Sequence, residues 1–314
     1  MSLNNLLAKG VNNINNLVSI LMRWRTHKFA WHTDISKMYN RVLLDESHWR
    51  FQLYLWDEGL RAGVPPKWKF VNSLIYGVKP SGQLAGIAIR KLAELVKDEC
   101  PLAYPVILND IYVDDNLSGA NSAKQRNVIT DQLALGLSKV KFFLKGFTFS
   151  GERPPAHLSS DGVSVGVAGC KWFSEEDEIS LKIPDLNFAK RLKGRKSGND
   201  VGKIPEKLTS SFKIDISHFT LRKLDWDDVI PDELRQVWES NFEMMQEIKN
   251  IRYKRAVIPN DAVSTDIQTI CTADASQVMI CVGIYVRFRR KSGSFSCQLL
   301  FGRSKVVPKD MTLP

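Results

Sequence analysis

The spacing of apolar residues divides the chain into segments of helical and of strand character. Apolar positions recur every three to four residues over 3–22, 81–96 and 122–140, which predicts three helices, with Ser81 as the N-cap of the second. Runs of apolar residues predict strands at 29–35, 51–56, 67–76, 104–108, 111–117, 141–149, 163–172 and 179–183. This mixture predicts an α+β fold.

The chain changes character after these strands. The segment 190–207 is rich in lysine and arginine and has few apolar residues, which predicts a basic linker or a poorly packed face. Pro231 then opens a helical pattern. From Asp266 onwards strand patterns return. We therefore expect a domain boundary near residue 260, and we find no internal repeat.

Composition adds charge to this picture. Hydrophobic residues make up 44% of the 314 and charged residues 25%, as in ordinary soluble globular proteins. Lys and Arg exceed Asp and Glu by 44 to 34, and the net charge of +10 suits a polyanionic partner. The five cysteines form no C-x-x-C pair and no Cys/His cluster has zinc spacing, so we expect reduced thiols inside the cell. We expect no membrane span and no secretory signal.

Three aspartates stand where strand patterns end or turn. Asp114 and Asp115 are adjacent, and Asp34 closes the strand predicted at 29–35. Carboxylates from a tight turn and from a neighbouring strand can hold two Mg²⁺ ions about 4 Å apart, the arrangement that nucleotide transfer uses. An Asp-Asp pair is more often a solvated turn, and Asp110, which shares strand parity with Asp114, is an alternative ligand. The spacing alone leaves the metal site open.

Three short motifs resemble those of a known enzyme family, and this resemblance favours the metal-site interpretation. Residues 34–39 (Asp-Ile-Ser-Lys-Met-Tyr) resemble motif A of reverse transcriptases, residues 76–82 (Tyr-Gly-Val-Lys-Pro-Ser-Gly) resemble motif B, and residues 112–115 (Tyr-Val-Asp-Asp) resemble motif C. The sequences of these motifs are similar to those in the Pol polyprotein of BEL/Pao long-terminal-repeat retrotransposons. Further stretches that resemble this family lie at 144–147, 169–172, 224–228, 230–231 and 272–276. The resemblance covers nearly the whole chain.

The resemblance implies a fold for three parts of the chain. Residues 1–150 would be a polymerase palm, a ferredoxin-like antiparallel sheet with helices on one face, with most of the fingers subdomain missing. Residues 151–260 would hold the primer-grip hairpin, the basic linker and a reduced thumb and connection. Trp172 in that hairpin has a core position as its alternative. Residues 261–314 would be a truncated RNase H-like β unit.

The resemblance also assigns roles to single residues. Asp34, Asp114 and Asp115 would hold two Mg²⁺ ions, which Mn²⁺ can replace. Lys145 would protonate the leaving pyrophosphate, unless it is a solvated surface lysine. Tyr39 would be the steric gate against a 2′ hydroxyl, unless it is a half-buried tyrosine at a strand end. The residues that would line the nucleotide and template path are Ile35, Tyr39, Gly77, Lys79, Pro80, Ser81, Gly82, Tyr112 and Val113.

The chain departs from the family pattern in three places. Only 33 residues precede Asp34, too few for a fingers subdomain, and residues 209–213 stand in place of a longer thumb segment. Asp274 resembles the first metal ligand of the RNase H domain, but the sequence stops at Pro314, before the region of the other acidic ligands. One carboxylate does not assemble a two-metal nuclease. We expect a truncated Pol without RNase H activity.

Two functions follow from these expectations. The first is an RNA-directed DNA polymerase that binds an RNA template, a DNA primer and deoxynucleoside triphosphates, with other Pol or Gag products as further partners. The second is a catalytically inactive nucleic-acid-binding remnant of a decayed retroelement. A third possibility, without any function, is a reading frame that makes no stable protein. By analogy with such elements, we expect a cytoplasmic virus-like particle, with the nucleus as the alternative location and no secretion.

Overall fold

The computed structural model describes residues 2–57, 65–182, 250–276 and 279–307, together with eight positions between 236 and 248. The chain divides into two compact units, Met1–Ala168 with Phe173–Asp177, and Gly169–Trp172 with Glu178–Pro314. The basic linker, the segment 209–213 and the start of the helix expected after Pro231 lie outside the described residues. The expected three-part division stays a prediction.

A five-stranded antiparallel sheet forms the centre of the first unit. Its strands are β1 (Phe29–Ser36), β4 (Ile111–Tyr112), β5 (Asp115–Ala120), β6 (Phe143–Leu144) and β7 (Thr148–Phe149). The order is β4-β5-β1-β6, and β7 also pairs with β1. In the β1–β5 pair Asp34 lies directly opposite Asp115. The strand register therefore brings two candidate ligands to one end of the sheet.

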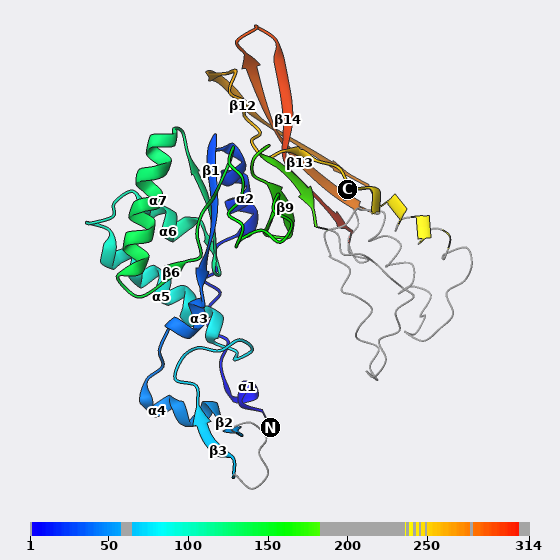
Figure 1. Cartoon of the computed structure of the whole chain (residues 1–314). Helices are drawn as coiled ribbons and strands as arrows, with labels where there is room; N and C mark the ends of the chain where they lie inside the picture. The colour runs from blue at the N-terminus through cyan, green and yellow to red at the C-terminus, as the bar shows by residue number, and fades with distance from the viewer. Residues whose placement is uncertain are drawn as a thin grey trace. The chain divides into compact units, whose positions relative to one another are not determined.

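Three helices lie along one side of β1 in Figure 1. They are α5 (Ser81–Val96), α6 (Ala103–Asn109) and α7 (Ala123–Ser138). Trp31 and Ile35 point to the same face of β1. Both are buried in a core cluster shared with residues of all three helices. His32 and Asp34 point to the other face of the strand and are only partly buried. The alternation thus separates a packing face from a face that carries polar chemistry.

Short elements complete the first unit. α1 (Leu3–Leu6) and α2 (Leu17–Thr26) precede β1, and α2 packs against β4 and β5. The elements that follow β1 are α3 (Met38–Arg41), α4 (Glu46–Trp49) and the 3-10 turn η1 (Arg50–Gln52). β2 (Leu53–Trp56) and β3 (Lys67–Phe70) pair only with each other within the described residues, and β8 (Val165–Val167) comes later in the unit.

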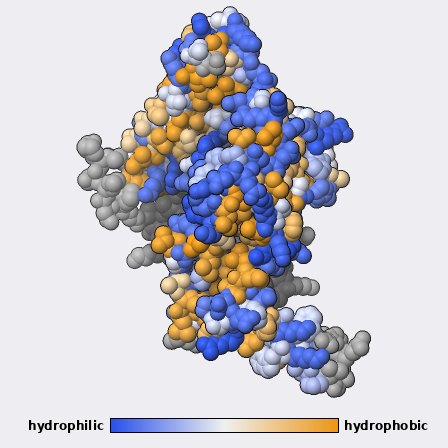
Figure 2. Space-filling view, turned by 90° about the vertical axis from the view of Figure 1, so that its left-hand side faces the viewer, coloured by the Kyte–Doolittle hydropathy of each residue, from blue (hydrophilic) through white to orange (hydrophobic). Residues whose placement is uncertain are grey.

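The described part of the second unit is mostly strand. β10 (Glu178–Leu181) and β11 (Tyr253–Lys254) belong to one sheet with β9 (Cys170–Phe173). Most residues of β9 lie in this second unit. β12 (Ala262–Ala275), β13 (Met279–Arg290) and β14 (Phe295–Val306) form an antiparallel meander. Hydrophobic side chains on this meander that remain exposed are Ile267, Ile270, Val282, Phe295 and Leu299. Orange patches at the top of Figure 2 mark this part of the surface.

The helix predicted over 3–22 is wrong in its middle. Residues 7–16 are not helical, and Gly10 has a φ of 78°. Asn16 is instead the N-cap of α2, where its side chain accepts a hydrogen bond from the Ser19 N–H. Asparagine side chains compete for backbone hydrogen bonds and favour caps and turns over helix interiors. In this segment the asparagines, which disfavour a helix interior, were therefore a better guide to the structure than the apolar spacing, which predicted a helix.

The strand predicted at 104–108 is also wrong, because this segment belongs to α6. The buried positions Ala103, Val106 and Ile107 follow helical spacing. A short apolar run fits either structure. Pro105 is tolerated in the first turn, where a backbone N–H has no helical partner.

The other predicted elements agree more closely with the structure. The strand at 29–35 and the helix at 122–140 are confirmed, and Ser122 caps α7 through the Gln125 N–H at 3.1 Å. The helix over 81–96 is confirmed, but its N-cap is Pro80, and Ser81 is its first residue. The remaining predicted strands each overlap an observed one.

Candidate active site

Three aspartates meet at one end of the five-stranded sheet. Asp34 lies near the end of β1 and faces Asp115, the first residue of β5. Asp114 lies in the turn between β4 and β5, where Val113 adopts a left-handed φ of 57°. The Asp114 carbonyl accepts a 2.8 Å hydrogen bond from the Ile35 N–H, which ties this turn to β1. The structure thus places the three aspartates that the motifs singled out at the same end of the sheet.

The Asp114 carboxylate lies in the field of the other two. Burial raises the pKa of Asp114, and the negative charges of Asp34 and Asp115 raise it further. A backbone hydrogen bond and the Lys145 ammonium act in the opposite direction, but the pKa stays above its ordinary value. The ionised form of Asp114 is therefore disfavoured, chiefly by burial. A divalent cation bound beside it would favour the ionised form.

Two basic side chains contact the outer carboxylates. Lys145 Nζ lies 2.8 Å from Asp34 Oδ1, and the Lys145 N–H donates to the Asp34 carbonyl at 3.0 Å. His32 Nε2 lies 3.0 Å from Asp115 Oδ1. The hydrogen bond with Asp34 raises the pKa of Lys145. The Lys145 side chain is half-exposed and contacts Asp34, so its catalytic role and the surface-lysine alternative both stay predictions.

The donor set fits Mg²⁺ in type, while the side chains do not converge on one point. Carboxylate oxygens are the ligands that Mg²⁺ prefers. Among the residues that the structure describes, no three acidic, histidine or cysteine side chains are grouped so that they could hold a metal ion. Asp34 and Asp115 contact Lys145 and His32 instead. Binding of a cation would therefore require these two carboxylates to exchange their partners for the metal.

Asp110, the alternative ligand, is committed to the fold. It is 8% exposed and lies at the end of α6. Its carboxylate accepts hydrogen bonds from Arg23 Nε at 2.9 Å and from Ser118 Oγ at 2.7 Å. Asn116 Nδ2 donates to the Asp110 carbonyl at 3.0 Å. These contacts join α2, α6 and β5, so Asp110 has a structural role.

Tyr39 connects motif A with motif B. It is 8% exposed, and its ring lies 4.4 Å from that of Tyr76, centroid to centroid. A Cβ added at Gly82 would lie 3.6 Å from the Tyr39 hydroxyl, so this hydroxyl sits directly above the start of α5. Burial, then the neighbouring Tyr76 and the charge of Asp114, raise the pKa of Tyr39. A buried ring whose hydroxyl lies beside the start of α5 is compatible with the gate assignment.

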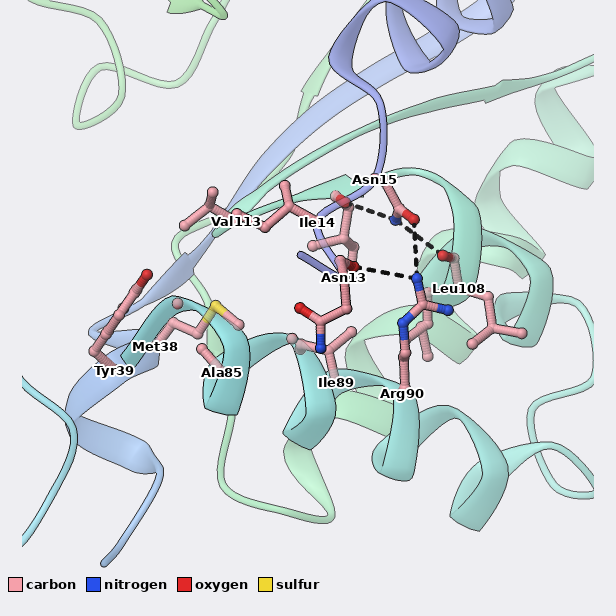
Figure 3. A pocket seen from close by; sticks show the side chains of 14 residues that line it. Asn13, Ile14, Asn15, Met38, Tyr39, Ala85, Ile89, Arg90, Leu108 and Val113 are labelled. Carbon is pink, nitrogen blue, oxygen red and sulfur yellow. Dashed lines mark hydrogen bonds between the residues drawn. The ribbon is translucent and has the colours of Figure 1, made fainter. Parts of the chain in front are cut away.

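A small pocket lies beside Tyr39, and Figure 3 shows it from close by. Three of the predicted path residues, Tyr39, Gly82 and Val113, contribute to its lining, together with residues of α5, α6 and the N-terminal segment. In Figure 3, Tyr39 lies at one end of the lining and Arg90 with Asn15 at the other. Residues from all three motifs thus contribute to this pocket.

Sequence reasoning missed the N-terminal residues that border this pocket. Asn15 Nδ2 donates to the carbonyls of Leu108 and Ile111, each at 2.9 Å. Asn13 Nδ2 donates to the Gln83 carbonyl at 3.1 Å. The available signal was the repeated asparagines, which are poor residues for a helix interior. The prediction of one continuous helix hid them.

The remaining path residues differ in accessibility. Ile35 and Ser81 are buried in the core and do not present their side chains at the surface. Gly77, Lys79 and Pro80 form the loop that precedes α5, and Tyr112 ends β4. Asn4 holds this loop, because its Nδ2 donates to the Gly77 carbonyl at 2.6 Å and its Oδ1 accepts from the Lys79 N–H at 2.9 Å.

Two residues of the second unit had sequence-based assignments. Trp172 is fully buried, which agrees with its core alternative. Asp274 is exposed near the end of β12, where its Oδ1 accepts from the Ala275 N–H at 2.9 Å. In the part of the chain with described positions it belongs to no cluster of metal-ligating side chains.

Residues 200–314 match the family model described as the Pao retrotransposon-like RNaseH-like domain. The match begins well before the RNase H-like part expected at 261–314. No curated protein matches the chain in sequence. No helix in the described residues is long and apolar enough to cross a membrane.

Two solved structures share the fold of the chain. One is the foamy viral protease-reverse transcriptase in complex with an RNA/DNA hybrid, with a TM-score of 0.56 and 13% identity over 95% of this chain and 36% of that one. The other is the foamy viral protease-reverse transcriptase dRH in complex with double-stranded DNA, with a TM-score of 0.55 and 15% identity over 96% of this chain and 47% of that one. The chain spans less than half of either structure. The likeness shows a mixed α/β fold similar to that of reverse transcriptase structures.

Proposed function

We propose that this chain is part of a retroelement Pol and that its first unit is the palm of an RNA-directed DNA polymerase. The observation that carries the proposal is the meeting of Asp34, Asp114 and Asp115 at one end of an antiparallel sheet, with Lys145 beside them. The Pao family match and the two reverse transcriptase folds support the same class. The RNA/DNA hybrid and double-stranded DNA in those structures support an RNA template and a DNA primer as partners here.

The chemistry of the proposal rests on a few residues. Asp34, Asp114 and Asp115 would hold two Mg²⁺ ions, or Mn²⁺ in their place. Bound metal would supply positive charge to the primer hydroxyl and to the phosphates of the deoxynucleoside triphosphate. Lys145, released from Asp34, would carry a proton to the leaving pyrophosphate. Tyr39 would exclude a 2′ hydroxyl from the pocket beside it.

Primer extension on an RNA template, with Mg²⁺ and deoxynucleotides, tests the proposal. The double variant Asp114→Asn with Asp115→Asn should lose extension by at least about 100-fold, because metal-ligand charge is worth several kcal/mol at the transition state. Asp131→Asn, an exposed aspartate of α7, is the matched control and should extend normally. Equal extension by the double variant and the control would refute a metal-dependent palm.

A catalytically inactive nucleic-acid-binding remnant is the second candidate. The observation that favours it is the pairing of Asp34 with Lys145 and of Asp115 with His32. Asn4 also forms hydrogen bonds with the Gly77 carbonyl and the Lys79 N–H in the loop before α5. This function predicts salt-dependent binding of primer-template without extension by the unaltered chain.

A further inference from the structure

The two-stranded sheet of β2 and β3, here called the β2–β3 ribbon, carries chemistry that the proposed polymerase site does not use. Its register places Leu53 opposite Phe70, Tyr54 opposite Lys69, Leu55 opposite Trp68 and Trp56 opposite Lys67. Directly opposed residues share a face of a sheet, and neighbours along a strand point to opposite faces. The ribbon therefore has two faces of different composition.

One face is apolar and the other combines aromatic rings with amines. The apolar face consists of Leu53, Leu55, Trp68 and Phe70. The second face, here called the aromatic–lysine face, consists of Tyr54, Trp56, Lys67 and Lys69. On the apolar face the Trp49 ring stacks on Phe70 with centroids 4.9 Å apart. All four residues of this face are nevertheless exposed, so what distinguishes the second face is its lysines and not its exposure.

The aromatic–lysine face is open to solvent. Tyr54 is 40% and Trp56 45% exposed, although aromatic rings of this size are usually largely buried. Their centroids lie 6.4 Å apart in an edge-to-face arrangement. Lys69 Nζ lies 4.9 Å from the centre of the Trp56 ring. Rings and ammonium groups are thus interleaved on one small surface.

We propose that the aromatic–lysine face binds single-stranded nucleic acid. Exposed rings bind unpaired bases by stacking, and nearby lysines neutralise the phosphates between them. A duplex hides its base faces within the helix, so it cannot use the rings in this way. An apolar protein surface would remove the hydration of the Lys69 ammonium group. The combination therefore selects a flexible polyanion with aromatic groups.

This surface is separate from the carboxylate cluster. The ribbon is a sheet of its own, and Figure 1 shows it beyond α3, which follows the end of β1 that carries Asp34. Its binding needs neither metal nor nucleotide, so the inference does not depend on the polymerase proposal.

Fluorescence anisotropy with a labelled single-stranded oligonucleotide, without Mg²⁺ and nucleotides, tests the inference on the full chain. The variant Tyr54→Ala with Trp56→Ala should bind at least about tenfold more weakly, since each stacked base contributes roughly that factor. Trp68→Ala with Leu55→Ala removes similar apolar area from the opposite face of the same ribbon and should bind normally. A blunt duplex of the same length should show no difference among these three proteins.

The lysines give a second measurement that does not depend on the rings. In Lys67→Gln with Lys69→Gln, the slope of log affinity against log salt should fall by about 1.4, at about 0.7 for each phosphate contact to a single strand. The variant Asp131→Asn, at an exposed position of α7 that neither proposal uses, should retain the binding. Unchanged affinity in the ring variant, or equal loss in the Trp68 control, would overturn it.

Discussion

The five-stranded sheet of the first unit and the β12–β14 meander of the second are both built from alternating strands, but they differ in what covers them. In the first, Trp31 and Ile35 are buried beneath α5, α6 and α7. In the meander, Ile270, Val282 and Leu299 remain at the surface of the described structure. Strand patterns therefore predict strands, whereas burial depends on amphipathic helices that the chain supplies elsewhere.

The two sheets also differ in their candidate metal ligands, which are Asp34, Asp114 and Asp115 in the first unit and Asp274 in the second. Asp34 faces Asp115 across a strand pair and shares the field of Asp114. Asp274 also lies near the end of a long strand, opposite Cys281. A strand end can present one carboxylate, but a two-metal site needs a second hairpin or helix that brings further carboxylates to it. The first unit has that hairpin in β4 and β5.

The largest expected difference concerns matched isoleucines in the two sheets. Ile35 is 1% exposed and Ile270 38% exposed. Ile35→Ala should destabilise the first unit by about 2–5 kcal/mol through lost burial and a residual cavity, and Ile270→Ala should cost less than about 1 kcal/mol in the second. Hydrogen exchange measured by mass spectrometry reports each unit separately. Similar losses of protection in both units would contradict the difference in burial.

The next difference lies within the first unit, between its structural and its candidate functional acid. Asp110→Asn disrupts contacts to Arg23 and Ser118 and should lower the free energy of unfolding by about 2–3 kcal/mol. Asp114→Asn removes a carboxylate that burial and like charge disfavour, and should not lower it. Urea denaturation of both variants measures this. Greater destabilisation by Asp114→Asn would reverse the two assignments.

The sequence predicted the elements that depend on local patterns and missed those that depend on contacts between distant segments. β1 and α7 were predictable, because an apolar run and apolar spacing of three to four residues are local signals. The opposition of Asp34 and Asp115 is a matter of register between distant strands, and only the resemblance of the motifs pointed to it. The non-helical path of residues 7–16 was not predictable from apolar spacing, because distant carbonyls determine it.

The N-terminal segment gives a smaller effect that tests this explanation. Asn15→Ala leaves the carbonyls of Leu108 and Ile111 without their side-chain donor, and should destabilise the first unit by about 1–2 kcal/mol. Asn5→Ala, an exposed asparagine of α1, is the control and should change stability by less than about 0.5 kcal/mol. Thermal unfolding compares the two. If Asn15→Ala behaves like its control, the segment is not held by these bonds.

The smallest effect concerns a carboxylate whose environment is opposite to that of Asp114. Hydrogen bonds from the Ser164 hydroxyl, then from the Ser164 and Val163 N–H groups, hold the pKa of Asp161 well below its ordinary value. A depressed pKa in the folded state stabilises the fold above the ordinary range of an aspartate, and this contribution disappears as the pH falls through that range and below it. Asp161 is exposed, so solvent screening limits the effect to about 1 kcal/mol or less.

Asp161→Ala should therefore be less stable than the unaltered chain at pH 7, and the difference should shrink steadily below about pH 4. The measurement is the free energy of unfolding in urea at several pH values, with Asp131→Asn as a control for the loss of one surface charge. A difference that stays constant with pH would mean that the carboxylate acts through packing rather than through its ionised form. A difference that shrinks would show that this loop gathers hydrogen-bond donors around one charge, whereas the turn at Asp114 gathers like charges.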